Sequence, residues 1–358
     1  MWHRSLFASL AALACVLLCF STLLAQKRKN EEPKTQVLPL PKELPMALAA
    51  DTATLDFHIS PLQRTGRLAA QIRQSLNELI RDTRGETIIK LRAFVAGAGD
   101  ARRVEAAVGD IFADKKLPLP VLSIIQVGAL ADNSAQVIIE AVVATKKIVN
   151  PNGLAFLAGQ TGASLNEALQ RLKDSVNAIP VSPERVLTCT CFTSHIADFP
   201  STRAAIQAVF PNTAINVVQA LREPPNDESM CEAVAQLAQP PAQGSVVWLK
   251  NARASLVNSH RLIFTGLQLT FGNYLDDAHE AFARLQRAAS ALEGVQAPVE
   301  VNAFSLDPYA GSALRKTTSV PLSTFTVQTV EGLPGVDAAA GIEAVLAPHV
   351  AEPVTVLR

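Results

Sequence analysis

Three short segments decide the fold of this chain: Ile139-Glu140-Ala141-Val142, Cys231-Glu232-Ala233-Val234 and Ile342-Glu343-Ala344-Val345. Their alternating residues are typical of β-strands. Each is preceded by another strand-like segment that carries a glutamine, at Gln126, Gln219 and Gln328. The glutamine-to-glutamate separations are 14, 13 and 15 residues. A pattern that recurs inside one chain predicts a repeated structural unit.

The rest of each unit recurs in the same order. Each unit is predicted to begin with a β-hairpin, in residues 46–59, 141–157 and 246–264. An amphipathic helix follows, with apolar residues three, four and seven apart, in residues 68–80, 165–176 and 278–292. A strand then ends at Phe94, Phe192 and Phe304, and a second helix covers residues 102–112, 201–210 and 308–316. With the two closing strands, the predicted order is β-β-α-β-α-β-β.

This order predicts an α+β fold in which two helices cover one face of each sheet. We place the three units at residues 46–145, 146–243 and 244–358. The open faces of three such sheets can pack against one another as a closed ring with approximate three-fold symmetry. The protein is therefore expected to be a monomer.

Composition restricts the function. The 358 residues are 49% hydrophobic and carry 32 basic and 32 acidic side chains. A formal charge of zero argues against nucleic acid as a partner, because binding to phosphates depends on excess positive charge. The six histidines are scattered, and no glycine-rich nucleotide loop is present. We therefore expect no cofactor and no metal.

The N-terminal segment is typical of an export signal. Residues 1–4 include a basic residue, residues 5–25 are uncharged and apolar, and residues 26–45 form a proline-rich charged linker. Cleavage after Ala25 is favoured, which predicts a periplasmic or extracellular protein. The alternative is an uncleaved anchor, since residues 5–25 are long enough to span a bilayer; this segment would be the only contact with a membrane.

Several segments together resemble the RidA family, also called YjgF/YER057c/UK114 or endoribonuclease L-PSP. They are Gly153-Leu-Ala-Phe-Leu-Ala-Gly-Gln160, the Ala197-Asp198-Phe199 turn and the closing Glu-Ala-Val strands. The resemblance extends over residues 46–358 as three divergent tandem copies. It implies a chorismate-mutase-like fold, assembly of three units and ligand clefts between neighbouring units. Here the trimer would be covalently joined into a pseudo-trimer.

The resemblance also implies an activity, the hydrolysis of 2-iminobutanoate and 2-iminopropanoate, in which an arginine holds the substrate carboxylate. That arginine would lie near Ser123, Ile215 and Thr326, and no arginine is within three residues of any of them. An acid that activates water would lie at Ile138, Met230 and Gly341. Because both polar participants are absent, we predict a non-catalytic protein, with a binding or scaffold role and a small metabolite or organic acid as ligand. The alternative is an enamine/imine deaminase with a relocated arginine, such as Arg64, Arg203 or Arg222.

Five residues are candidates for ligand binding: Gln160, Gln268, Glu140, Glu232 and Glu343. The glutamines follow the hairpin ends that shape the clefts in the family. For the glutamates a structural role competes with ligand binding, because a buried strand carboxylate must be paired, for instance with an arginine near a unit interface. The state of Cys189, Cys191 and Cys231 stays open between one disulfide and buried thiols.

Overall fold

The computed structural model describes residues 43–96, 100–196, 198–241, 246–272, 275–293, 296–317 and 324–348. The predicted export signal, residues 26–42 of the linker and Ala197 of the family-like turn lie outside these residues. No helix in the described ranges combines the length and apolarity needed to cross a bilayer.

Three mixed sheets form the described part of the chain. The first sheet is β2 (Leu55–Ile59), β6 (Val137–Ala144), β3 (Thr87–Ala96) and β4 (Val121–Val127). The second is β11 (Val246–Leu249), β12 (Ala254–Val257), β7 (Leu154–Gly162), β10 (Ser229–Gln236), β8 (Val186–Thr193), β9 (Ala214–Gln219) and β5 (Ala129–Leu130). The third is β1 (Ala47–Asp51), β13 (Arg261–Thr265), β17 (Ala340–Pro348), β15 (Gln296–Ser305) and β16 (Phe325–Thr329), with β14 (Gln268–Thr270) also paired to β17.

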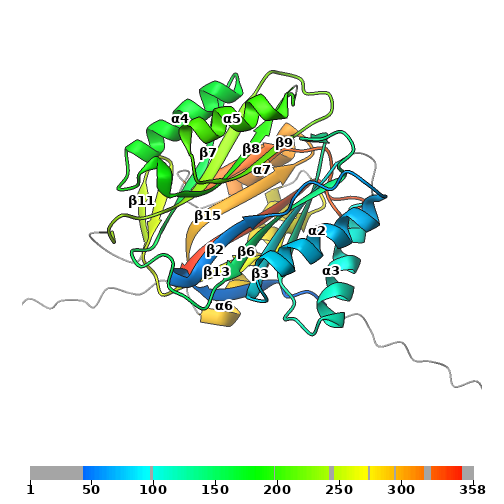
Figure 1. The fold of residues 1–358 in the computed structure, drawn as a ribbon, viewed down its shortest axis with the longest axis horizontal. Coiled ribbons are helices and arrows are strands. Elements are labelled where there is room, and N and C mark those ends of the chain that lie inside the picture. The colour runs from blue at the N-terminus through cyan, green and yellow to red at the C-terminus, as the bar shows by residue number, and fades with distance from the viewer. Residues whose placement is uncertain are drawn as a thin grey trace, which may run out of the picture. The chain divides into compact units, whose positions relative to one another are not determined.

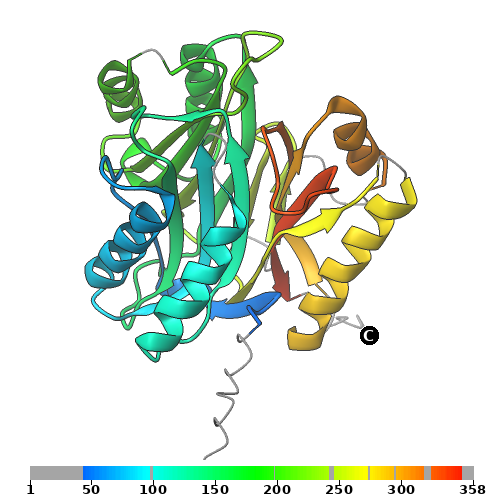
Figure 2. The ribbon, with the colours of Figure 1, turned by 90° about the vertical axis from the view of Figure 1, so that its right-hand side faces the viewer.

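Two helices cover one face of each sheet, as predicted. They are α2 (Leu68–Asp82) and α3 (Arg102–Asp114), α4 (Leu165–Asn177) and α5 (Phe199–Val209), and α6 (Leu275–Glu293) and α7 (Pro308–Thr317). In Figure 1, α4 and α5 lie over β7, β8 and β9. Figure 2 shows α6 and α7, in yellow and orange, on the outer side of the third sheet. The apolar stripes predicted from spacing, such as Ile72 and Leu76 on α2, are fully buried.

The faces without helices pack against one another. One apolar cluster joins Phe94, Phe192 and Phe304, one from each sheet. A second contains Leu55, Phe156 and Phe264, again one from each sheet. The fold is therefore α+β, with three similar units arranged as an intramolecular pseudo-trimer. We call the line along which the three inner faces meet the axis.

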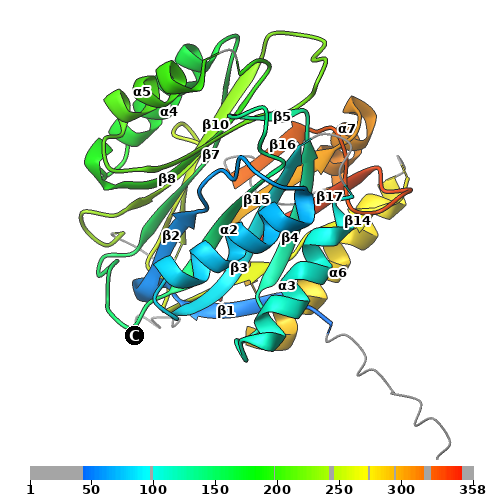
Figure 3. The ribbon, with the colours of Figure 1, turned by 45° about the vertical axis from the view of Figure 1, so that its right-hand side comes forward.

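None of the predicted hairpins pairs the two strands expected, although in the third unit β11 and β12 do form a hairpin within residues 246–257. The strands expected to form them lie in different sheets: β1 pairs with β13 and β2 with β6, while β6 and β7 belong to separate sheets and β12 pairs with β7. The chain crosses from one sheet to the next at these points, as Figure 3 shows for β1 and β2. Hydrophobic alternation predicts a strand but not its neighbour, so a crossing strand has the same signature as a hairpin arm.

The crossing strands join the units to each other. By analogy with β1 and β12, a strand near residues 145–150 would extend the first sheet, but the chain there is a turn. The side-chain amide of Asn150 holds the turn by donating to the carbonyls of Leu55 at 2.7 Å and Thr52 at 3.2 Å. Asn150 is only 2% exposed, so this amide replaces strand hydrogen bonds that would otherwise be unmade.

Candidate functional site: a charged cluster on the axis

Equivalent strands place equivalent residues at the axis. The closing-strand glutamates lie opposite one residue of the preceding inner strand: Glu140 opposite Arg92, Glu232 opposite Thr190, and Glu343 opposite Asn302. Two residues earlier, the three inner strands carry Lys90, Thr188 and Glu300, which lie opposite Val142, Val234 and Val345. The three units share one backbone arrangement here, yet their side chains differ in charge.

Arg92 connects the three glutamates. Its Nε donates to Glu140 at 2.6 Å, its Nη2 to Glu232 at 2.7 Å and its Nη1 to Glu343 at 3.3 Å. The Arg92 side chain is 12% exposed, and its guanidinium carbon lies 5.5 Å from the centre of the Phe94 ring. One buried cation therefore pairs with carboxylates from all three units, which a planar fork of five donors can do.

The remaining partners are divided unequally among the glutamates. Lys90 Nζ lies 2.9 Å from Glu343. Glu140 accepts further bonds of 2.6 Å from Thr190 and from Asn216. Glu300 has no ion pair to Lys90 or Arg92 in the described part of the chain. We call Lys90, Arg92 and the four glutamates Glu140, Glu232, Glu300 and Glu343 the axial cluster.

Burial and charge act on these carboxyl groups in opposite directions. Burial raises the pKa of Glu300 to about 8, and the charge of Glu232 adds to the effect. Burial also raises the pKa of Glu232 against the attraction of Arg92. For Glu343, burial is outweighed by Lys90 and Arg92, so its pKa lies below the ordinary value. With two cations and four carboxyl groups, the cluster carries an acidic surplus that protonation relieves.

A cavity of about 70 Å³ lies beside the cluster. Its walls carry all six cluster residues together with Thr188 and His58 and an apolar lining of Phe57, Phe156, Phe264 and the opposing valines. Phe57, Thr188 and Glu300 are partly exposed, so this end of the cavity reaches solvent. Such a volume holds a few water molecules or the end group of a small ligand.

The other end of the axis is closed. Phe94 and Phe192 contact edge to face with ring centres 5.6 Å apart, and the centres of Phe192 and Phe304 are 6.1 Å apart. All three are at most 2% exposed. The charged layer is thus accessible from one side only.

The positions where the family has its arginine carry short polar side chains in this chain. Strand register aligns Ser123, Asn216 and Thr326, so Asn216 rather than Ile215 is the equivalent in the second unit. A Cβ on Gly159 would meet Met230 Sδ at 2.2 Å and the Thr326 methyl at 2.9 Å.

Two of the three acid positions are closed. A Cβ on Gly341 would meet Leu267 at 2.9 Å, and Ile138 is 5% exposed. Gly341 and Ile138 are thus closed, whereas Met230 lines a cavity of about 330 Å³ between the second and third units, together with Gln328.

The structure separates the predicted ligand residues. Gln160 is 8% exposed and donates to the Ala158 carbonyl at 3.0 Å. Gln268 lines a different cavity, of about 340 Å³, between the first and third units. The three glutamates meet at the axis, where the predicted pairing with an arginine is confirmed. Whether any of these five binds a ligand stays a prediction.

The arginines suggested as replacements lie elsewhere. Arg64 is 74% exposed and pairs with Asp132 at 2.8 Å, Arg222 is 57% exposed and lies 3.8 Å from Glu331, and Arg203 is exposed on α5. Arg92, which sequence reasoning missed, had a signal: Lys90 and Arg92 alternate within an apolar strand just before a phenylalanine. Thr188 and Thr190, like Glu300 and Asn302, repeat that polar pair.

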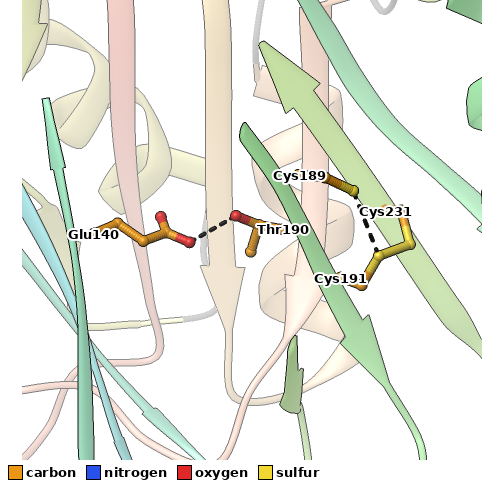
Figure 4. Close-up of a disulfide and its surroundings, with 5 residues drawn as sticks. All are labelled: Glu140, Cys189, Thr190, Cys191 and Cys231. Atoms are coloured by element: carbon orange, nitrogen blue, oxygen red, sulfur yellow. Dashed lines mark hydrogen bonds between the residues drawn. A yellow bond between two sulfur atoms is a disulfide. The ribbon is translucent and has the colours of Figure 1, made fainter. Parts of the chain in front are cut away.

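Cys189, Cys191 and Cys231 lie on the helix side of the second sheet. Cys191 and Cys231 form a disulfide between neighbouring strands, and Cys189 is a buried free thiol with its Sγ 3.8 Å from that of Cys191. Figure 4 shows Thr190 pointing toward Glu140 while its two cysteine neighbours point the opposite way. Burial raises the pKa of Cys189, which makes this thiol a poor nucleophile.

Solved proteins resemble single units of this chain. The YjgF gene product from E. coli is 21% identical, with a TM-score of 0.24, and the match covers 29% of this chain and 94% of that one. The chain is similar in structure to YjgF-type proteins. E. coli TdcF, solved with bound serine, is 17% identical with a TM-score of 0.24, covering 30% of this chain and all of that one. Rv2704 from Mycobacterium tuberculosis, a member of the YjgF/YER057c/UK114 family, is 23% identical with a TM-score of 0.20, covering 29% and 82%. No family model and no curated protein matches the sequence.

Proposed function

We propose that this chain is an exported, non-catalytic binding protein that takes a small molecule into the axial cavity. The proposal rests on one observation, the difference between the family's site positions and the axis of this protein. No arginine or acid occupies the family's site positions, and the acid position at Gly341 is closed by Leu267, while a cavity with charged and aromatic walls is present on the axis. Convergent polar groups in an apolar pocket are typical of ligand sites.

The enamine/imine deaminase alternative has weaker support. Arg92 is a cation beside a cavity, but its N–H groups are directed to three protein carboxylates. A substrate carboxylate would have to displace one of these glutamates. The export part of the proposal is supported by the apolar N-terminal segment and by the Cys191–Cys231 disulfide, since disulfides persist in oxidising compartments.

Two measurements on the purified protein test the proposal. A thermal-shift screen of small amines, alcohols, acids and amino acids is expected to give ligands that stabilise the fold. Thr188→Phe, which fills the cavity from a partly exposed strand position, should abolish those shifts. Thr161→Phe, a partly exposed strand residue away from the cavity, is the matched control and should keep them.

Hydrolysis of an imine generated from an amino acid is the second measurement, with a RidA enzyme as positive control. No turnover above buffer is expected. Turnover above buffer would refute the non-catalytic assignment. Ligands that bind equally well to Thr188→Phe would refute the axial site.

A further inference from the structure

We infer that the ligand of the axial cavity is a small organic ammonium ion with a short apolar chain, and that its nitrogen binds at Glu300. This inference rests on the proposed function of the cavity and names the class of molecule it takes. It follows from which charges of the axial cluster are already paired.

The two cations of the cluster are saturated. Arg92 donates to Glu140, Glu232 and Glu343, and Lys90 lies 2.9 Å from Glu343. An anionic ligand would compete with these protein carboxylates and would add to an acidic surplus. The cavity therefore disfavours the organic acid expected from the sequence.

The unpaired carboxyl group of Glu300 favours a ligand that donates hydrogen bonds. Glu300 lines the cavity, is partly exposed and carries no ion pair to the cluster's cations in the described ranges. An ammonium group provides three hydrogen-bond donors and a positive charge that offsets the acidic surplus of the cluster.

The apolar walls suit the rest of such a ligand. Phe57, Phe156 and Phe264 occupy equivalent places on three sheets, each opposite a valine of the closing strand. Aromatic faces attract organic cations and also cover an alkyl chain. The volume of about 70 Å³ restricts that chain to a few carbon atoms.

Binding is coupled to a proton. Burial raises the pKa of Glu300 to about 8, so at neutral pH the free protein holds a proton there. An incoming ammonium ion stabilises the carboxylate, and the proton leaves to solvent as the cation enters. An alkylammonium ion, like lysine, keeps its own charge up to about pH 10, so its affinity should increase as the pH rises from 6 to 9.

Other titratable groups face Glu300 and enter the same pH dependence. His58 lines the cavity, and its hydrogen bond with Asp56 raises its pKa. Deprotonation of His58 would also favour a cation, so His58→Gln is needed as a control and should keep the coupling. The remaining charged groups that line the cavity come from other strands than β15: Lys90 and Arg92 on β3, Glu140 on β6, Glu232 on β10 and Glu343 on β17.

Titration calorimetry with n-butylammonium, n-butanol and butyrate tests the inference. We expect n-butylammonium to bind at least tenfold more tightly than either of the others at pH 8. Its heat should differ between phosphate and Tris in proportion to the proton released. Glu300→Gln should remove the proton release and weaken n-butylammonium at least tenfold, while n-butanol binding stays unchanged.

The outcomes separate the two proposals. If butyrate or n-butanol binds at least as tightly as n-butylammonium, and Thr188→Phe abolishes that binding, the cavity is a ligand site and the ammonium inference is wrong. If n-butylammonium binds without proton release, or binds Glu300→Gln equally well, the role of Glu300 is wrong. If none of the three binds and the thermal-shift screen also yields no ligand, the proposed function itself fails.

Discussion

Replacing Arg92 with methionine should destabilise the protein strongly at pH 8 and only weakly at pH 5. The side chain is 12% exposed and makes contacts of 2.6, 2.7 and 3.3 Å with three carboxylates. Removing one partner of a buried ion pair costs about 3–5 kcal/mol. Because three carboxylates lose their shared cation here, we expect the upper part of that range, about 4–5 kcal/mol, at pH 8.

The pH dependence follows from the carboxyl groups that remain. Without Arg92, at least one glutamate has a folded-state pKa raised above its unfolded value of about 4.3. Below that pH the carboxyl group is protonated in both the folded and the unfolded protein. As the pH rises from there toward the folded-state pKa, the unfolded protein loses the proton first and the free energy of unfolding falls. One proton contributes about 1.4 kcal/mol per pH unit, so lowering the pH from 8 to 5 should recover about 4 kcal/mol. The loss relative to the unmodified protein would then be about 1 kcal/mol at pH 5.

Urea denaturation followed by circular dichroism at pH 5, 6, 7 and 8, without reductant, measures both values. Arg73→Met is the matched control: Arg73 is 52% exposed and lies 3.5 Å from Asp110, so its loss should be at most about 1 kcal/mol at every pH. A loss for Arg92→Met that is equal at pH 5 and pH 8 would refute the electrostatic reasoning.

A charge exchange tests the equivalence of the units. Thr190 occupies the place of Arg92 in the second sheet, opposite Glu232. In the double variant Arg92→Thr, Thr190→Arg, the guanidinium reaches the axis from another direction and should recover more than half of the stability lost in Arg92→Thr alone. A double variant no more stable than Arg92→Thr would show that the axis is not pseudo-symmetric in its electrostatics.

Three further changes test other parts of the structure by the same urea method. Glu300→Gln removes a carboxyl group whose pKa is raised to about 8. From pH 5 to 8, its free energy of unfolding should therefore increase relative to that of the unmodified protein by up to about 1.4 kcal/mol per pH unit, and the difference should stay constant above pH 8. A difference that does not change between pH 5 and 8 would contradict this. Cys231→Ser opens a cross-link with a sequence separation of 40 and should cost about 4 kcal/mol, with no additional effect of reductant. Gly153→Ala places a Cβ 2.0 Å from the Val257 carbonyl oxygen at φ +93° and should cost more than about 2 kcal/mol, whereas Gly109→Ala, with open space on α3, should be neutral or stabilising.

The sequence predicted the units well and their connections poorly. Apolar residues three and four apart fix a helix and its buried face, so residues such as Leu169 and Leu172 could be assigned to the core from their spacing alone. Strand pairing between distant segments leaves no comparable local signal. The crossing of β1 to β13 therefore could not be distinguished from a hairpin with β2.

The candidate site was also predicted only in part, because its glutamates were found from the sequence and its arginine was not. The three glutamates could be found because they recur in equivalent segments. Arg92 could not be found by recurrence, because Thr190 and Asn302 occupy its equivalent positions. The sequence feature that pointed to Arg92 was a Lys-x-Arg pair inside an otherwise apolar strand. Buried charges of this kind need partners of opposite charge to be stable. In a chain of three similar units, a residue such as Arg92 that differs from its two equivalents is therefore a candidate for a role at the axis.

Joining three units in one chain is what makes this axis possible. In an assembly of three identical chains, any residue near the axis occurs three times, so an arginine at the position of Arg92 would face two others. Here one guanidinium bridges glutamates from three units, with a threonine and an asparagine at the equivalent places. The next layer carries Lys90, Thr188 and Glu300, one positive, one neutral and one acidic. A covalent pseudo-trimer can thus hold a directional arrangement of charge on its axis. In the described part of the chain, this produces an asymmetric axial cavity lined by Glu300, a carboxyl group without an ion pair to the cluster's cations.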